Sequence, residues 1–231
     1  MPAATAFLVG TEWEFRHRSL LIFVLCAAVG AAALALPDPF TNGRLWLELP
    51  WMRAAAFTVA AAGVAFRVWA TGYLPFVIIA DRNIHAPKLV DAGPYAVTRN
   101  PLYLGTWLAV TSLGLVLNLW AALILPVVMA LKVLRIIGFE EQRLLAAFGA
   151  DYAAYAARVP RLIPCSLSAV RRALGEKSDW LYGVKGNFFI LGLPVGYLAA
   201  MIRPSFGTIF ACVGLGYLAQ WPALRAERGG R

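Results

Sequence analysis

The apolar residues of this chain gather in long blocks that are separated by shorter polar stretches. A helix needs about 20 mostly apolar residues to cross the ~30 Å hydrocarbon core of a bilayer. The pattern predicts six membrane-spanning helices, with five as the alternative because the last two blocks are only about 15 residues long. No block contains more than two charged residues, and the blocks are Ser19–Leu36, Trp51–Leu74, Pro101–Leu117, Leu119–Ile137, Phe188–Ile202 and Phe206–Trp221.

Short connections between blocks predict how the helices are arranged. Little more than Asn118 separates the third block from the fourth, which predicts an antiparallel hairpin. The segment Arg203–Ser205 contains a proline and predicts the turn of a second hairpin between the last two blocks.

The stretch 139–157 continues the fourth block with a different pattern. Apolar and aromatic residues recur there at spacings of three and four, which predicts an amphipathic helix on the cytosolic side of the membrane. We expect Gly149 to interrupt this helix, and Pro160 and Pro164 to end it.

Composition supports a membrane protein and excludes several other classes. Of the 231 residues, 61% are apolar and only 14% are charged, whereas soluble domains have about 25% charged residues. This composition excludes a disordered chain and an ordinary soluble enzyme. The three cysteines are too few and too scattered for a disulfide scaffold, and with only two histidines a metal centre is not expected. The expected fold class is therefore all-α: a polytopic helical membrane protein with five to six transmembrane helices and a cytosolic amphipathic helix.

Two alternative interpretations apply to the apolar blocks. The blocks could be buried core helices, but six of them in 231 residues leave no polar shell to cover them. The first block could be a secretory signal, because the basic segment Arg16–Arg18 precedes it and Ala33–Ala35 is cleavage-like.

The positive charges predict the orientation in the membrane. With the N-terminus inside and six crossings, 15 of the 21 Lys and Arg residues fall in inner segments. We therefore expect both termini to be cytoplasmic. The bias towards Ala, Arg and Gly suggests a GC-rich bacterial genome, so the expected location is a bacterial inner membrane. The net charge of +9 then favours anionic membrane lipids as partners rather than nucleic acid, with Arg171, Arg172 and Lys177 contacting head groups.

Three basic residues lie inside the apolar blocks: Arg67, Lys132 and Arg135. Charged groups within a membrane are costly and are therefore functional candidates. The alternative for each is that its long side chain reaches the nearby interface.

The stretch 89–105 carries the strongest local signals. Gly93-Pro94 indicates a turn, Asn100 is a good N-cap, and Pro101 suits the first position of a helix. A helix N-terminus favours anions, and Arg99 can hold a carboxylate or phosphate through two hydrogen bonds. The alternative is a capped helix anchored at the interface by Tyr95 and other tyrosines.

Two sequence motifs lie in this stretch and after the fourth block. The first motif is Gly93-Pro94-Tyr95-x-x-x-Arg99-Asn100-Pro101-x-Tyr103-x-Gly105. The second is Glu140-Glu141-x-x-Leu144-x-x-x-Phe148-Gly149-x-x-Tyr152-x-x-Tyr155-x-x-x-Val159-Pro160-Arg161-x-x-Pro164. Together they resemble one family of membrane enzymes, the isoprenylcysteine carboxyl methyltransferase and phospholipid methyltransferase superfamily. The resemblance covers about Trp51 to Pro164, and it has two departures: Asn100 stands where many relatives have histidine, and His85 lies two residues before the position of another family histidine.

The resemblance implies a cofactor and a set of residues that bind it. The family uses S-adenosylmethionine, whose carboxylate would meet Arg99 and whose ammonium and ribose hydroxyls would meet Glu140 and Glu141. Arg135 and Glu140 are the catalytic candidates, the first for orienting a carboxylate acceptor and the second for taking a proton from an amine. The expected cofactor-binding residues are His85, Leu89, Val90, Gly93, Pro94, Tyr95, Arg99, Asn100, Pro101, Tyr103, Glu140 and Glu141, and no metal ligands are expected.

The resemblance also implies a domain organisation and a function. Residues 1–50 would hold the first transmembrane helix and an outer loop, residues 51–164 the methyltransferase core, and residues 165–231 a basic linker with a C-terminal hairpin. The implied function is methyl transfer to the carboxylate or amine of a lipophilic or prenylated acceptor at the cytoplasmic membrane face. The alternatives are an NADPH-dependent membrane reductase of the sterol-reductase type and a non-catalytic membrane binding or transport protein. The sequence leaves the acceptor and the oligomeric state open.

Overall fold

The computed structural model describes residues 9–41, 45–74, 89–164 and 166–229, and these residues form helices and connecting loops without a strand. The predicted all-α fold class is therefore confirmed. The elements in chain order are α2 (Glu12–Arg16), α3 (Arg18–Leu34), the 3₁₀ helix η1 (Trp46–Glu48), α4 (Pro50–Thr71), the 3₁₀ helix η2 (Gly93–Ala96), α6 (Pro101–Thr111), α7 (Gly114–Leu117), α8 (Leu119–Arg158), α9 (Leu167–Leu174), α10 (Trp180–Lys185), α11 (Phe188–Ile202) and α12 (Phe206–Gly229).

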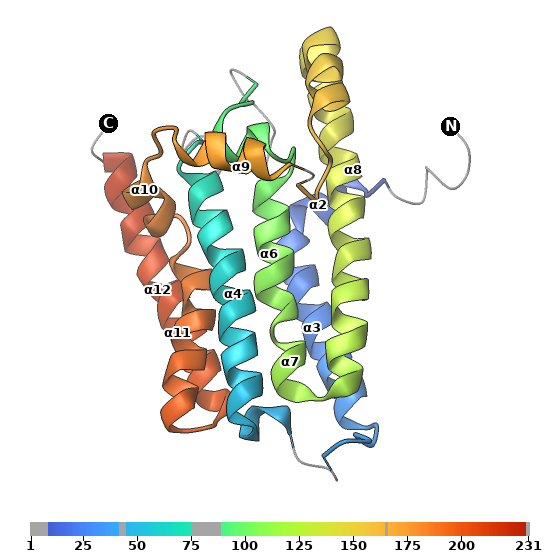
Figure 1. Cartoon of the computed structure of the whole chain (residues 1–231), viewed down its shortest axis with the longest axis vertical. Coiled ribbons are helices and arrows are strands. Elements are labelled where there is room, and N and C mark those ends of the chain that lie inside the picture. Colours follow the sequence, from blue (N-terminus) through green and yellow to red (C-terminus); the bar gives the residue numbers. More distant parts are fainter. Residues whose placement is uncertain (1–8, 42–44, 75–88, 165, 230–231) are drawn as a thin grey trace.

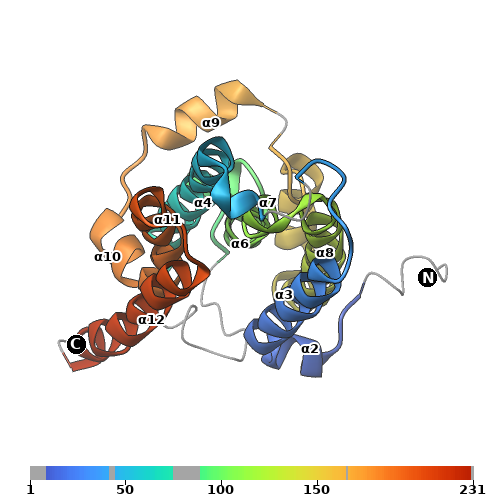
Figure 2. The same cartoon turned by 90° about the horizontal axis from the view of Figure 1, so that it is seen from below.

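The long helices run side by side along the length of the molecule (Figure 1). Helix α4 packs between α6 and α11, α12 packs on α11, and α3 packs against α8. The short elements η2, α9 and α10 gather at one end of the bundle, where α2 and the C-terminal end of α12 also lie. Viewed along the bundle, α9 lies outside α4, on the side away from α3 (Figure 2).

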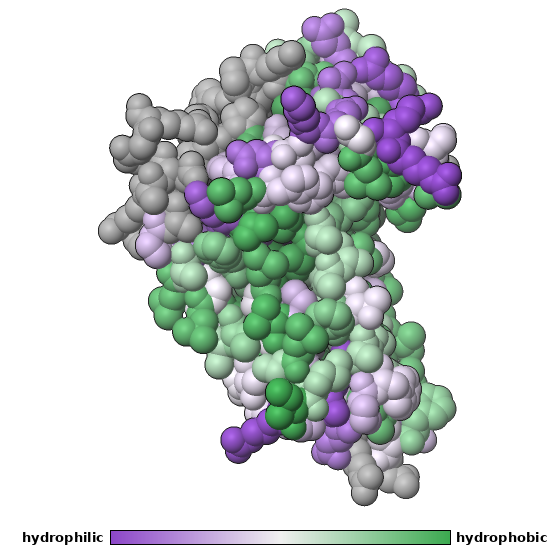
Figure 3. Space-filling model, turned by 60° about the vertical axis from the view of Figure 1, so that its left-hand side comes forward, coloured by the Kyte–Doolittle hydropathy of each residue, from purple (hydrophilic) through white to green (hydrophobic). Residues whose placement is uncertain are grey.

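Each predicted block corresponds to a helix or a pair of helices. Helices α4 and α8 are long and apolar enough to cross a membrane, and α3, α6–α7, α11 and residues 206–220 of α12 are shorter apolar helices. The surface has a broad apolar band along the bundle, with hydrophilic residues concentrated towards its two ends (Figure 3). These features fit a helical protein integral to a membrane.

Both predicted hairpins are present. Asn118 turns the chain between α7 and α8, where its side chain accepts a hydrogen bond from the Ala121 amide at 3.0 Å and donates one to the Ala33 carbonyl at 2.7 Å. The second hairpin, α11–α12, closes tightly because Gly192 and Gly196 of α11 lie against the backbone of α12. The third block is one unbroken helix in the prediction, whereas the structure divides it into α6 and α7 at residues 112–113.

Helix α8 carries the amphipathic extension that the sequence predicts. Its 40 residues correspond to a length of about 60 Å, twice the ~30 Å hydrocarbon core. The helix is bent at Gly149, whose backbone has a φ of 52°, and it ends at Arg158, just before Pro160. The half that begins near Gly138 therefore projects beyond the membrane-spanning part.

Helices α4 and α6 approach each other closely through two glycines. A Cβ atom on Gly105 would lie 2.6 Å from the Gly63 carbonyl oxygen and 2.9 Å from the Arg67 Cβ atom. A Cβ atom on Gly63 would lie 2.6 Å from the Ala109 amide nitrogen. Small residues that let backbones meet are a common basis of helix packing in membranes.

We expect the substitution Gly105→Ala to destabilise the protein by about 2–3 kcal/mol, because the added methyl group meets backbone that cannot move aside. The thermal unfolding midpoint in detergent measures the effect. The matched control is Gly214→Ala on α12, where a Cβ atom would meet nothing within 4 Å. Equal midpoints for the two variants would contradict the close α4–α6 contact.

The structure decides between the two interpretations of Arg67. Its Nε donates to the Asn187 side-chain oxygen at 2.6 Å, and its Nη1 donates to the Thr106 hydroxyl at 2.6 Å. The side chain thus points into the bundle and joins α4 to α6 and to the start of α11, rather than reaching the interface. Lys132 on α8 is also buried, and its Nζ finds no hydrogen-bond partner in the described part of the chain.

Candidate functional site

The first motif starts with a backbone turn that only glycine accommodates well. Gly93 has a φ of 56°, and a Cβ atom there would lie 2.2 Å from the Tyr73 ring. Its amide donates to the Glu176 carboxylate at 2.8 Å. Pro94 and Tyr95 follow within η2, and both are buried. The turn thus fixes where Tyr95 and the following residues enter the site.

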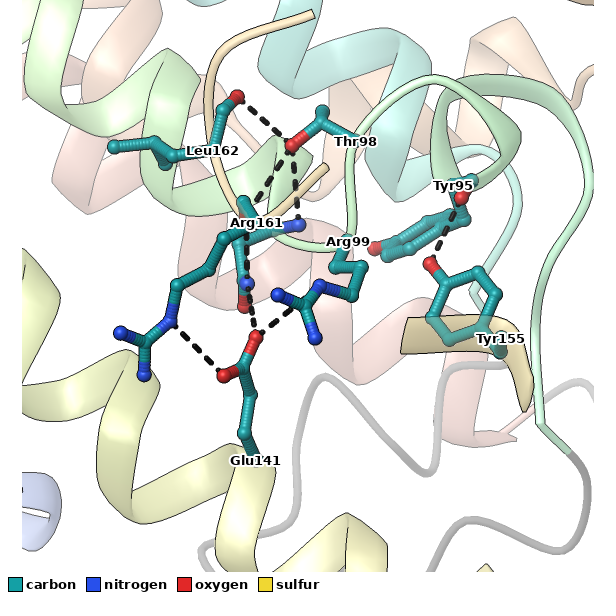
Figure 4. Close-up of polar contacts among 8 residues, drawn as sticks. Tyr95, Thr98, Arg99, Glu141, Tyr155, Arg161 and Leu162 are labelled. Atoms are coloured by element: carbon teal, nitrogen blue, oxygen red, sulfur yellow. Dashed lines mark hydrogen bonds and ion pairs between the residues drawn. The ribbon is translucent and has the colours of Figure 1, made fainter. Parts of the chain in front are cut away.

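Residues 98–100 are bonded to residues 160–162, which follow α8. The Arg99 amide donates to the Pro160 carbonyl at 2.9 Å. The Thr98 hydroxyl donates to the Leu162 carbonyl at 2.8 Å (Figure 4). These bonds bring the two sequence motifs together at one end of the bundle.

Glu141 on α8 is the electrostatic centre of this junction. Its carboxylate accepts a hydrogen bond from Arg161 Nε at 2.9 Å and lies 3.5 Å from Arg99 Nε. The Asn100 side-chain amide donates to the same carboxylate at 3.2 Å and to the Arg161 carbonyl at 2.9 Å. Two guanidinium groups and an amide thus converge on one carboxylate, and Figure 4 shows it pointing from α8 towards them.

The prediction for Asn100 is correct in position and wrong in detail. Asn100 does occupy the N-cap of α6, but its side chain makes no capping hydrogen bond to the helix described here. The side-chain amide is directed to Glu141 and Arg161 instead. A polar residue at a helix start is therefore used to join two distant segments.

A group of tyrosines lies beside the junction. The Tyr155 hydroxyl donates to the Tyr95 carbonyl at 2.8 Å, and the Tyr152 and Tyr155 rings pack 5.9 Å apart. Leu89 packs against these two rings together with Leu144 and Phe148. Burial raises the pKa of Tyr95, Tyr152 and Tyr155 above the usual value, so their hydroxyl groups stay protonated and can donate.

Four buried polar atoms near the junction have no hydrogen-bond partner among the residues that the structure describes. They are Tyr95 Oη, Arg99 Nε, Glu140 Oε2 and Tyr152 Oη. About 90% or more of buried polar groups in folded proteins are paired, so four such atoms in one region require an explanation. Both donors and an acceptor are present, which suits a polar ligand that carries groups of both kinds.

These groups belong to one electrostatic neighbourhood. Glu140 acts on the pKa of Tyr95, Tyr103 and Tyr152, and Arg99 acts on that of Tyr152 and Tyr155. Burial raises the pKa of Glu140, while a hydrogen bond with Tyr103 opposes the rise. A cationic ligand next to this carboxyl group would favour its charged form.

The structure brings most of the predicted cofactor-binding residues to this end of the bundle. Gly93, Pro94, Tyr95, Arg99 and Asn100 lie in one loop before α6, and Glu140 and Glu141 face it from α8. Pro101 and Tyr103 occupy the first turn of α6, and Leu89 and Val90 lead into the loop. His85 lies outside the described residues.

The structure places Arg135, the other catalytic candidate, in a different set of contacts. Its Nε and Nη2 donate to the two carboxylate oxygens of Glu14 at 3.1 and 3.0 Å, and its carbonyl accepts from the Gly10 amide. Glu14 is itself held by a capping box with Thr11 at the start of α2. The bond from Arg135 holds the pKa of Glu14 below its usual range.

Sequence reasoning left out three residues that hold the site together. Arg161 stands in the second motif, so its position there was an available signal. Thr98 and Glu176 carry no such signal, because their partners lie 64 and 83 residues away in the chain.

The fold and the site define a helical membrane protein with a polar binding region at one end of its bundle. Residues 51–151 match the phospholipid methyltransferase family. This segment runs from the start of α4 to the projecting half of α8, and it contains the first motif and about the first half of the second. Members of this family are integral membrane methyltransferases. Residues 51–151 of the chain therefore match that family, and the resemblance seen in its motifs is confirmed.

One curated protein is similar over a longer stretch. The nickel-cobalt-cadmium resistance protein NccN of Alcaligenes xylosoxydans xylosoxydans is 31% identical over 154 residues, which is 64% of this chain and 65% of that protein. The match thus spans less than two thirds of the relative's length. No solved structure matches the chain significantly.

Proposed function

We propose that this protein transfers a methyl group from S-adenosylmethionine to a lipophilic acceptor at the cytoplasmic face of a bacterial inner membrane. The observation that carries the proposal is the set of buried atoms on Tyr95, Glu140 and Tyr152 that have no hydrogen-bond partner among the described residues, next to the guanidinium group of Arg99. They lie where the two motifs of a methyltransferase family meet.

The donors and acceptors of the site fit the groups of this cofactor. Arg99 would bind its carboxylate, because a guanidinium group and a carboxylate form short, charge-assisted hydrogen bonds. Glu140 would accept from its ammonium group or ribose hydroxyls, and the hydroxyls of Tyr95 and Tyr152 would donate. The aromatic faces of these tyrosines suit a cationic sulfonium centre.

When bound, the cofactor supplies an electrophilic methyl group on its sulfonium. The work of the protein is then to position donor and acceptor in line and to keep water out. Glu141 contributes by holding Arg99 and Arg161 in place, and the bonds between residues 98–100 and 160–162 fix the loop that carries Arg99. The buried tyrosines exclude water from the same region.

The acceptor would be an amphiphile whose tail lies between the apolar helices. Glu140 is the residue that we assign to an amine acceptor, because its carboxylate has an unpaired oxygen that can take a proton. Arg135 would orient a carboxylate acceptor only if its pair with Glu14 opened. The present arrangement therefore favours Glu140 as the residue next to the reacting group.

The same arrangement supports one orientation in the membrane. The site, α2 and the C-terminal end of α12 share one end of the bundle. Most of the basic residues fall in the segments at that end, which the positive-inside rule assigns to the cytoplasm. We therefore place the site and both termini on the cytoplasmic side.

The first test is calorimetric binding of S-adenosylmethionine to the detergent-purified protein. We expect micromolar affinity for the original chain and a loss of at least about tenfold in Arg99→Ala. The control is Arg203→Ala, which changes an exposed arginine in the turn between α11 and α12. Methyl transfer to extracted membrane lipids, followed with a labelled methyl donor, then identifies the acceptor. Binding of NADPH in place of S-adenosylmethionine by folded protein would overturn the proposal in favour of a reductase.

A further inference from the structure

Helix α9 lies across the end of the bundle instead of along it (Figures 1 and 2). Its inner side packs on the bundle: Ala173 is buried in a cluster with Trp69 at the end of α4 and Val97 in the first motif. Because Trp69 closes a membrane-spanning helix, α9 lies at the depth where the apolar band ends. The helix is also outside the segment that matches the methyltransferase family.

The outer side of α9 combines exposed apolar and basic residues. Leu167 is 68% exposed and Leu174 is 56% exposed. Arg171 stands between them on the same face, because positions four and seven residues after Leu167 share one side of a helix. Arg172 is exposed next to it, and Ile163, which is 71% exposed, precedes the helix.

This combination fits the polar surface of a lipid bilayer. Helices that lie in the membrane interface bury an apolar face among head groups and acyl chains, and their basic residues attract anionic lipids. The nearest acidic side chain after α9, that of Glu176, is already bonded to the Gly93 amide. Among the residues that the structure describes, no ion pair involves Arg171 or Arg172, so both present their positive charge at the level of the head groups.

We propose that α9 docks on the anionic lipid head groups of the cytoplasmic leaflet and thereby holds the first motif in place. Leu167 and Leu174 enter the interface, and Arg171 and Arg172 bind the acidic head groups. The docked helix acts on the motif through the Glu176–Gly93 hydrogen bond and through the packing of Ala173 on Val97. Anionic lipid would thus order the loop that contains Tyr95 and Arg99.

The test is amide hydrogen exchange of the whole protein in lipid nanodiscs. One set of discs contains phosphatidylcholine alone, and the other contains equal parts of phosphatidylcholine and phosphatidylglycerol. We expect the amides of residues 167–177 to exchange at least about fivefold more slowly in the anionic discs, the effect of one interfacial arginine. In the double variant Arg171→Gln/Arg172→Gln this difference should disappear, whereas Arg203→Gln at the far end should keep it.

A second variant separates docking from its effect on the motif. In anionic discs, Glu176→Ala should keep residues 167–177 protected while residues 91–98 exchange faster. Equal exchange of residues 167–177 in both kinds of disc would overturn the docking, and unchanged exchange of residues 91–98 in Glu176→Ala would overturn the coupling. Neither measurement needs cofactor or acceptor, so this proposal can fail independently of the proposed methyl transfer.

Discussion

Glutamine in place of Glu140 is expected to weaken S-adenosylmethionine binding by at least about tenfold, which corresponds to 1.4 kcal/mol, without destabilising the protein. The substitution keeps the shape of the side chain and removes a buried carboxylate that has one unpaired oxygen. A neutral amide there is no longer penalised by burial, so the thermal midpoint should stay the same or rise. The cofactor, in contrast, loses the anionic partner of its ammonium group.

The pH dependence of binding gives this prediction a second readout. Burial raises the pKa of Glu140 above its usual value, so the ionised form becomes populated only as the pH rises through that higher value. Affinity for S-adenosylmethionine should therefore increase with pH over this range. The contribution to folding has the opposite sign: a carboxyl whose pKa is higher in the folded state binds more protons when folded, so stability falls as the pH rises between the unfolded and folded pKa values.

Calorimetric titrations across the acidic pH range measure the effect on binding, and thermal midpoints at the same pH values measure the effect on folding. In Glu140→Gln the rise of affinity with pH should be absent. The control is Glu12→Gln on α2, because Glu12 is exposed and pairs only with its helix neighbour Arg16 in the contacts described. Unchanged affinity in Glu140→Gln would remove Glu140 from the cofactor site.

Alanine in place of Glu141 is expected to have the larger effect on stability. The substitution leaves Arg99 and Arg161 close together without the carboxylate between them, and it removes the acceptor of the Asn100 amide. Removing one member of a fully buried ion pair costs about 3–5 kcal/mol, and at most the lower end of this range applies here because the pairs of Glu141 are only part-buried. At the lower end this corresponds to a fall in Tm of roughly 6–12 °C for a chain of this size, and cofactor binding should be lost as well.

A second ion pair in the same region serves as the matched control. Asp91 and Arg158 also join the loop to α8, at 2.8 Å, but their side chains are 48% and 63% exposed. Exposed pairs contribute about 0–1 kcal/mol, so Asp91→Ala should change Tm by only a few degrees. If the two variants melted at the same temperature, Glu141 would not be the centre of the junction.

The membrane-spanning architecture could be predicted from the sequence because it depends on local patterns. Block lengths and hairpin links follow from runs of apolar residues, and the predicted segment Phe188–Ile202 coincides with α11. The break between α6 and α7 was not predicted in this way, since neither Ser112 nor Leu113 is charged or a proline.

Side-chain partners could not be predicted, because they lie far apart in the chain. Glu14 and Arg135 are 121 residues apart, and Arg67 and Asn187 are 120 residues apart. Arg67 has a long side chain near the end of an apolar block, as expected for a residue that reaches the interface. Only the packing of α4 against α6 and α11 shows which groups accept hydrogen bonds from its guanidinium group. The motifs name residues that the structure brings to one end of the bundle, whereas the position of Glu141 between Arg99 and Arg161 is visible only in the structure.

The hydrogen bonds between residues 98–100 and 160–162 can form only late in the synthesis of this protein, so they determine the order in which its parts assemble. Thr98 and Leu162 are 64 residues apart, and a ribosome adds about 5–20 residues per second. The loop must therefore wait about 3–13 s for its partner, while the intervening hairpin enters the bilayer. The hairpin between them is therefore synthesised before these bonds can form, and a chain in which it failed to insert would lack the junction that joins the two motifs.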